Sequence, residues 1–220
     1  MINTKDSEIY LYTVSNLLMI IEEFNQIYRN VEYDELREIA NYRFKELDLS
    51  VRISYPFRNM ASFDCKTEKN REVDIVVRDK GLEIEVKYLR NYNSKAGTSN
   101  SANWKNTFEK DYSWICNKIK SGEKGKSAFI IGWFNAYERF SQIVQLGTGK
   151  SSRPLINKER MKIFPFVNVQ ENGTRVDEVF YMYNKAYQPL NINIDGCDSS
   201  CVDCVFLGKP EDKFHFAIYY

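Results

Sequence analysis

The fold is decided by the stretch Arg71-Glu-Val-Asp-Ile-Val-Val-Arg-Asp-Lys-Gly-Leu-Glu-Ile-Glu-Val-Lys-Tyr-Leu-Arg90, which carries acids inside a strand-like pattern. The runs Val73–Val77 and Leu82–Leu89 are rich in β-branched and aliphatic residues. Between them, Asp79-Lys80-Gly81 has the composition of a turn. The stretch therefore predicts an antiparallel hairpin.

Side chains alternate between the two faces of a strand, so Glu83, Glu85 and Lys87 share one face. A turn of two residues (80–81) or four residues (79–82) places Asp74 opposite Lys87 and Val76 opposite Glu85. Asp74, Glu85 and Lys87 then cluster on one face. A three-residue turn would move Asp74 to the other face, so the predicted cluster depends on the length of the turn.

Two carboxylates and an ammonium arranged in this way have Cβ atoms roughly 5–8 Å apart. Carboxylate oxygens are hard ligands that suit Mg²⁺, and the carbonyl of Val86 adds a further oxygen. A lysine beside the metal orients or deprotonates an attacking water. The alternative is a solvated strand on which acidic and basic residues form ordinary cross-strand salt bridges.

Asp74, followed after ten residues by Glu85-Val86-Lys87, resembles the PD-(D/E)XK nuclease superfamily, although Val73 stands where that family has a proline. The resemblance implies that Asp74 and Glu85 are metal ligands and that Lys87 is the lysine of the Glu-x-Lys motif. It implies a Mg²⁺-dependent endonuclease, with Mn²⁺ as a substitute, that hydrolyses DNA in restriction or defence. The alternative is a non-catalytic member of the same fold that binds a protein as an inhibitor or immunity module.

The order of predicted elements agrees with the core of the resembled fold, which is helix, strand, strand, strand, helix, strand. We expect an α/β protein with a restriction-endonuclease-like core, in which helices flank a mixed central sheet, and with a β-rich C-terminal portion. The expected organisation is one domain, 1–220, with the core at 32–135 and the extension at 136–220. The core elements are a helix at 32–47, a strand at 51–57, a loop at 58–70, the hairpin, a helix at 101–120 and a strand at 126–135.

Two helices carry acids with more than one interpretation. Glu35 lies in the first turn of the helix at 32–47, where acids complement the helix dipole. In the resembled family a glutamate on this helix often joins the metal site, so Glu35 is a further catalytic candidate. Asp111 borders the apolar stripe of the helix at 101–120, where it and Lys118 are either a structural ion pair or polar residues near the site.

The C-terminal portion predicts short strands at 141–146, 161–169, 176–183, 204–207 and 214–220. A basic stretch precedes most of them and contains five cations, Lys150, Arg153, Lys158, Arg160 and Lys162, against one acid. These residues are candidates for contacts to DNA phosphates, and a solvated loop is the alternative.

Three cysteines near the C-terminus, Cys197, Cys201 and Cys204, precede the only histidine, His215. Together they offer four ligands to a structural Zn²⁺. Only Cys201 and Cys204 have the usual paired spacing, which favours ordinary cysteines in a turn and a strand.

Composition limits the remaining possibilities. The formal net charge is +1, so a nucleic-acid surface must be a local patch. The sequence opens without a signal peptide or a membrane span, which predicts a cytoplasmic protein that does not contact membrane. An amphipathic helix at 7–29 packs either on the domain or on a second subunit, which would form a homodimer.

Overall fold

A computed structural model describes residues 10–66, 72–89, 108–123, 125–136, 147–148, 155–193 and 201–220. Its helices are η1 (Tyr10–Val14), α2 (Ser15–Ile27), α3 (Tyr33–Glu38), η2 (Ile39–Arg43), α4 (Glu46–Ser54), η3 (Tyr55–Met60), η4 (Arg78–Lys80), α6 (Glu109–Lys120), α8 (Lys158–Met161) and η6 (Tyr183–Lys185). Its strands are β1 (Ala61–Lys66), β2 (Glu72–Val77), β3 (Leu82–Tyr88), β4 (Ser127–Phe134), β5 (Gly147–Thr148), β6 (Leu155–Ile156), β7 (Val167–Asn172), β8 (Arg175–Tyr181), β9 (Pro189–Asn193), β10 (Cys201–Leu207) and β11 (Phe214–Tyr219).

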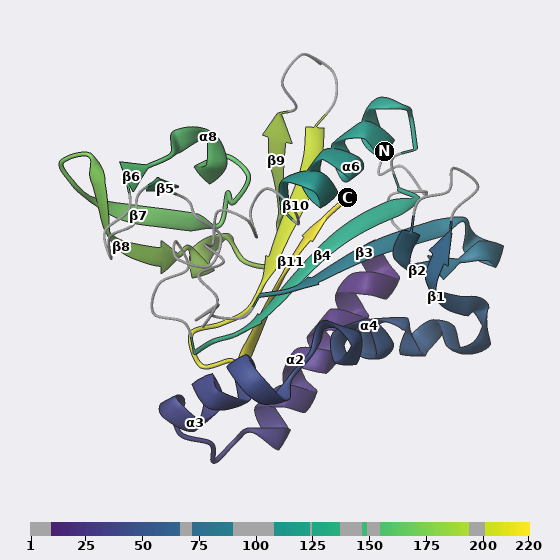
Figure 1. The fold of residues 1–220 in the computed structure, drawn as a ribbon, viewed down its shortest axis with the longest axis horizontal. Helices are drawn as coiled ribbons and strands as arrows, with labels where there is room; N and C mark the ends of the chain where they lie inside the picture. The colour runs from purple at the N-terminus through teal and green to yellow at the C-terminus, as the bar shows by residue number, and fades with distance from the viewer. Residues whose placement is uncertain are drawn as a thin grey trace.

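The protein is α/β, and its described strands form two sheets. The larger sheet has seven strands in the order β1-β2-β3-β4-β11-β10-β9. It is mixed, because β3 and β4 are parallel while the other neighbours are antiparallel. The smaller sheet has the order β5-β6-β8-β7 and lies beside the larger one (Figure 1).

Helices cover both faces of the larger sheet, with α2, α3 and α4 on one face and α6 on the other (Figure 1). On the α2 and α4 face, Phe24 of α2 stacks on Phe134 of β4. On the α6 face, Phe108, which precedes α6, contacts Phe129 of β4. Helix α6 connects the parallel strands β3 and β4, since parallel neighbours require a crossover connection.

Gly132 of β4 allows α4 to lie close against the sheet. A Cβ atom at this position would lie 2.8 Å from Cδ2 of Leu49 and 2.8 Å from Cε1 of Phe214. Both distances are shorter than van der Waals contact. The absence of a side chain at residue 132 therefore sets the distance between α4 and the sheet.

The structure corrects two elements that precede the hairpin. Residues 51–57, predicted as a strand, belong to α4 and η3, and residues 61–66 of the predicted loop form β1. Leu49, Ile53 and Phe57 are buried at a helical spacing of four residues, whereas Val51 and Tyr55 are exposed, so the period is 3.6 and not 2. The predicted helix at 32–47 divides into α3 and η2, and α4 begins anew at Glu46.

The C-terminal portion is β-rich, as expected, and contributes to both sheets. Strands β9, β10 and β11 complete the larger sheet, whereas β5–β8 form the smaller one. The smaller sheet packs on the larger through stacked rings, because Tyr181 of β8 lies against Phe206, and Phe166, directly before β7, lies against Trp133 and Phe206. The strand predicted at 161–169 begins only at Val167, and residues 158–161 form α8 instead. The strand predicted at 141–146 lies outside the described residues.

No helix within the described ranges is both long and apolar enough to cross a membrane.

Candidate active site

The hairpin forms with a four-residue turn, but its register differs from the prediction. Val77 pairs with Leu82 and Val76 with Glu83, so the turn is 78–81 and the predicted pairing of Val76 with Glu85 is wrong. An even turn length keeps the parity of the strands. Asp74 and Glu85 therefore belong to the same face of the sheet. The predicted position of Asp74 opposite Lys87 is wrong as well, because this register differs by two residues and the paired positions end at Ile75 and Ile84.

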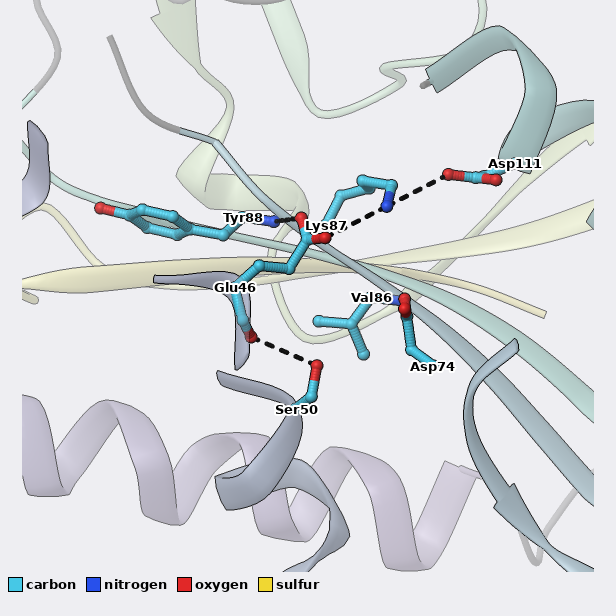
Figure 2. A network of polar contacts seen from close by, with 7 residues as sticks. All are labelled: Glu46, Ser50, Asp74, Val86, Lys87, Tyr88 and Asp111. Atoms are coloured by element: carbon cyan, nitrogen blue, oxygen red, sulfur yellow. Dashed lines mark hydrogen bonds and ion pairs between the residues drawn. The ribbon is translucent and has the colours of Figure 1, made fainter. Parts of the chain in front are cut away.

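Strand β3 loses its partner β2 near Asp74, and two carboxylates replace the missing backbone acceptors. The paired positions of β2 and β3 end at Ile75 and Ile84. Beyond that point Oδ2 of Asp74 accepts a hydrogen bond of 2.7 Å from the backbone N–H of Val86 (Figure 2). Oε2 of Glu46 accepts one of 2.9 Å from the N–H of Tyr88. Because buried backbone donors require acceptors, this open strand edge fixes both acids.

Lys87 lies between two acids from different helices (Figure 2). Its Nζ is 3.3 Å from Oε1 of Glu46 at the start of α4 and 3.6 Å from Oδ2 of Asp111 in α6. The side chains of Lys87 and Asp111 are only 16% and 6% exposed. One ammonium thus connects the two helices that cover opposite faces of the sheet.

The charges around Lys87 set its protonation. Burial lowers the pKa of Lys87, but Glu46, Asp74 and Asp111 raise it, so that it lies above the ordinary value for a lysine. The pKa of Glu46 is raised by burial and by Asp74, although Lys87 and the Tyr88 N–H oppose that effect. Lys87 is therefore a cation at neutral pH.

Glu85 completes the group of residues that we call the β3 cluster: Glu46, Asp74, Glu85, Lys87 and Asp111. Glu85 is two residues from Lys87 on the same face of β3 and is 5% exposed. The β3 cluster combines four carboxyl groups with one ammonium in a largely buried region. Such an excess of acids favours the binding of a cation.

Glu35, the glutamate proposed from the sequence, is not the one that reaches this cluster. It lies in α3, is exposed, and is not among the charges that act on Lys87. Glu46 reaches the cluster instead, because α4 packs on β3 and brings Oε1 of Glu46 to 3.3 Å from Nζ of Lys87. The sequence held a signal for it, since Glu46 and Asp48 form an acidic first turn and Asp48 accepts a hydrogen bond from the N–H of Lys45.

The β3 cluster fits Mg²⁺ in the kind and number of its donors. Among the side chains that the structure describes, no group of three or more His, Cys, Asp or Glu could hold a metal ion. Mg²⁺ does not require such a group, because it usually takes one or two carboxylates and keeps several waters. Asp74 and Glu85 supply two carboxylates. The carbonyl of Val86 faces the same open edge as its N–H, since both groups of a strand residue point to one neighbour.

Lys118 forms a separate ion-pair group at the opposite end of β3. Its Nζ is 2.9 Å from Oε2 of Glu83 and 2.8 Å from Oε2 of Glu123. Of the two polar residues that the sequence placed on this helix, Asp111 thus belongs to the β3 cluster and Lys118 to a structural contact between α6 and β3.

The proposed zinc site is contradicted where the structure tests it. Cys204 pairs with Tyr219, which is four residues from His215 along β11 and therefore roughly 13 Å away. Zinc ligands lie about 2.0–2.3 Å from the metal, so Cys204 and His215 cannot share an ion. Both residues are fully buried, Cys204 beside Tyr219 and His215 among aromatic rings. Cys197 and the side chain of Cys201 lie outside the described residues.

The structure describes only some of the five basic residues that are candidates for contacts to DNA phosphates. Lys150 and Arg153 lie outside the described residues. Lys158 is exposed on α8, whereas Arg160 and Lys162 line a hollow between α8 and α6. The structure therefore places Arg160 and Lys162 beside the helix that carries Asp111.

Comparisons of the chain with protein-family models, with curated proteins and with solved structures find no match.

Proposed function

We propose that this protein is a Mg²⁺-dependent nuclease of the restriction-endonuclease-like type that hydrolyses phosphodiester bonds in DNA. The observation that carries the proposal is the position of Asp74, Glu85 and Lys87 at the open edge of β3, where Glu46 joins them. The resemblance in sequence rests on three of these residues. Glu46 adds independent support, because the sequence pattern did not include it.

Asp74, Glu85 and the carbonyl of Val86 would hold the metal ion. When bound, Mg²⁺ would polarise the phosphodiester and lower the pKa of an attacking water. Val86 contributes through its N–H as well, since it fixes one oxygen of Asp74 and leaves the other for the ion.

Lys87 has a role that follows from its two ion pairs, which favour the ammonium form. An ammonium is a poor general base, so it would stabilise the negative charge that develops on the phosphate oxygens. Glu46 and Asp111 hold the ammonium from two sides and restrict its position. This refines the role expected from the sequence, which included deprotonation of the water.

Cleavage of supercoiled plasmid with Mg²⁺ or Mn²⁺ tests the proposal, with Lys87→Met as the variant. We expect it to lose activity by at least about 100-fold, because it removes a charge that acts on the transition state. Lys118→Met is the matched control, since Lys118 is equally buried, also contacts two acids and also joins β3 to α6. Equal activity of the two variants, or a folded native protein that cuts no DNA, would refute the proposal and leave the protein-binding module as the function to test.

Binding of the metal is tested separately by thermal unfolding. At a Mg²⁺ concentration about 100 times Kd, the ion stabilises the native protein by about 2.7 kcal/mol, which raises Tm by about 5–10 °C. Asp74→Asn should abolish the shift, yet its amide oxygen still accepts the hydrogen bond from Val86. Asp79→Asn in the exposed turn is the control and should keep the shift. A full shift in Asp74→Asn would exclude Asp74 as a ligand.

A further inference from the structure

Helix α6 has two polar faces, and only one of them belongs to the β3 cluster. Asp111 and Lys118 face β3. On the opposite side, Asn117 and Lys120 line a hollow of about 500 Å³ together with residues of α8 and β9. Binding sites for small ligands typically have volumes of about 300–1,000 Å³.

Three cations from two separate parts of the chain line this hollow: Lys120 from α6, Arg160 from α8 and Lys162 directly after it. The guanidinium of Arg160 is partly removed from water, and this burial lowers its pKa, although Glu109 opposes the shift. Lys162 contacts Glu159 at 2.7 Å, but both side chains are more than half exposed. Such an exposed ion pair contributes at most about 1 kcal/mol, so a phosphate can replace the carboxylate.

The hollow also contains donors and acceptors of the kinds that recognise a nucleobase. Asn117 and Asn193 contribute amides and Glu109 a carboxylate, whereas the side chain of Asn157 caps α8 by accepting from the N–H of Arg160. Amides form paired hydrogen bonds with adenine, and carboxylates accept from cytosine. A site with cations for a phosphate and amides for a base edge suits one nucleotide.

We propose that the hollow between α6, α8 and β9 binds a nucleotide unit, as a subsite that holds the substrate strand away from the β3 cluster. This proposal rests on the proposed nuclease function, which supplies the nucleotide as part of a substrate strand. A free mononucleotide has the same phosphate and base and would fit the same hollow. A strand at Lys87 must pass around α6, and half the circumference of a helix about 10–12 Å across is about 16–19 Å, so the strand would reach the hollow after roughly five nucleotides at 3.4 Å each.

The test is fluorescence anisotropy with a labelled single-stranded oligonucleotide in EDTA, so that neither cleavage nor a metal is required. The variant is Lys120→Gln/Lys162→Gln, because both lysines are exposed and their loss does not threaten folding. The control is Lys110→Gln/Lys209→Gln, which removes the same charge from two exposed lysines outside the hollow. We expect the variant to bind the oligonucleotide about tenfold more weakly. The slope of log K against log[salt] should become shallower by about 1.4, since each phosphate contact with a single strand contributes about 0.7 to it.

Competition by dAMP and by inorganic phosphate distinguishes the two sources. Displacement of the oligonucleotide by millimolar dAMP, lost in the variant, would support a site for free nucleotides; displacement only by unlabelled oligonucleotide would support a strand subsite. Equal affinity of the variant and the control for the oligonucleotide would overturn the proposal. So would a native protein that binds neither the oligonucleotide, nor dAMP, nor inorganic phosphate. Plasmid cleavage by native protein alongside equal affinities would refute the subsite and leave the nuclease function standing.

Discussion

His215 is expected to make the protein sensitive to acid. Its ring is fully buried against Trp133, Tyr181, Tyr183 and Phe206. Nε2 donates a hydrogen bond of 3.0 Å to the carbonyl of Lys209, and within the described residues Nδ1 has no hydrogen-bond partner. A second proton would place a charge at Nδ1 without an acceptor. Burial accordingly lowers the pKa of His215 to about 4, although the Lys209 carbonyl and the nearby Asp212 oppose the shift.

The sign and size of the effect follow from this pKa. The unfolded chain binds a proton at His215 below about pH 6.5, but the folded protein binds it only below about pH 4. Between these values the unfolded state holds more protons, so the free energy of unfolding decreases as the pH falls. The loss relative to pH 8 is about 2 kcal/mol at pH 5 and about 3 kcal/mol at pH 4.

Urea unfolding followed by tryptophan fluorescence at pH 8, 6 and 5 measures this loss. His215→Gln removes the titrating group, while its amide can still donate to the Lys209 carbonyl. Because His215 is the only histidine, the difference between native protein and variant isolates its contribution from the carboxylates, which titrate in both. The free energy of the variant should fall by about 2 kcal/mol less than that of native protein between pH 8 and 5. Parallel curves, or a histidine NMR signal that titrates near pH 6.5 in the folded protein, would refute the reasoning.

Two further predictions concern how the β3 cluster is supported. Gly132→Ala should lower the free energy of unfolding by about 1–3 kcal/mol, because the added Cβ would lie 2.8 Å from Leu49 and Phe214 and push α4 from the sheet; an unchanged urea midpoint would contradict this packing. Tyr88→Phe should cost about 1 kcal/mol in the same assay, since it removes a buried hydrogen bond from the Tyr88 hydroxyl to the carbonyl of Ala40. Stability equal to the native protein would show that this bond contributes nothing net.

Local patterns in the sequence identified much of the fold. The hairpin, the buried strand at 126–135 and the last two strands follow from β-branched and aliphatic runs bounded by turn residues. The predictions of a helix at 32–47 and a strand at 51–57 were wrong for two reasons. Alternation of Val51, Ile53 and Tyr55 imitates a strand. The acids Glu46 and Asp48, which mark the first turn of a new helix after the extended Phe44 and Lys45, were not used as a helix start.

The candidate site was partly accessible from the sequence. Parity along β3 placed Glu85 and Lys87 on one face, and the even turn kept Asp74 with them. The exact register was not accessible, because turns at 78–81 and 79–82 have the same length and similar composition. Glu46 and Asp111 are 41 residues before and 24 residues after Lys87 in the sequence, so only packing brings them to it.

The sequence by itself determined the alternation of acids and apolar residues in β3, because side-chain direction in a strand is a local property. Only the tertiary structure decided which carboxylates surround Lys87. The pairing of β2 with β3 ends at Ile75 and Ile84, and beyond Ile84 the backbone N–H groups of Val86 and Tyr88 recruit Asp74 and Glu46 as acceptors. The need to satisfy buried backbone donors is a property of the folded chain, and it places Asp74 and Glu46 beside Lys87.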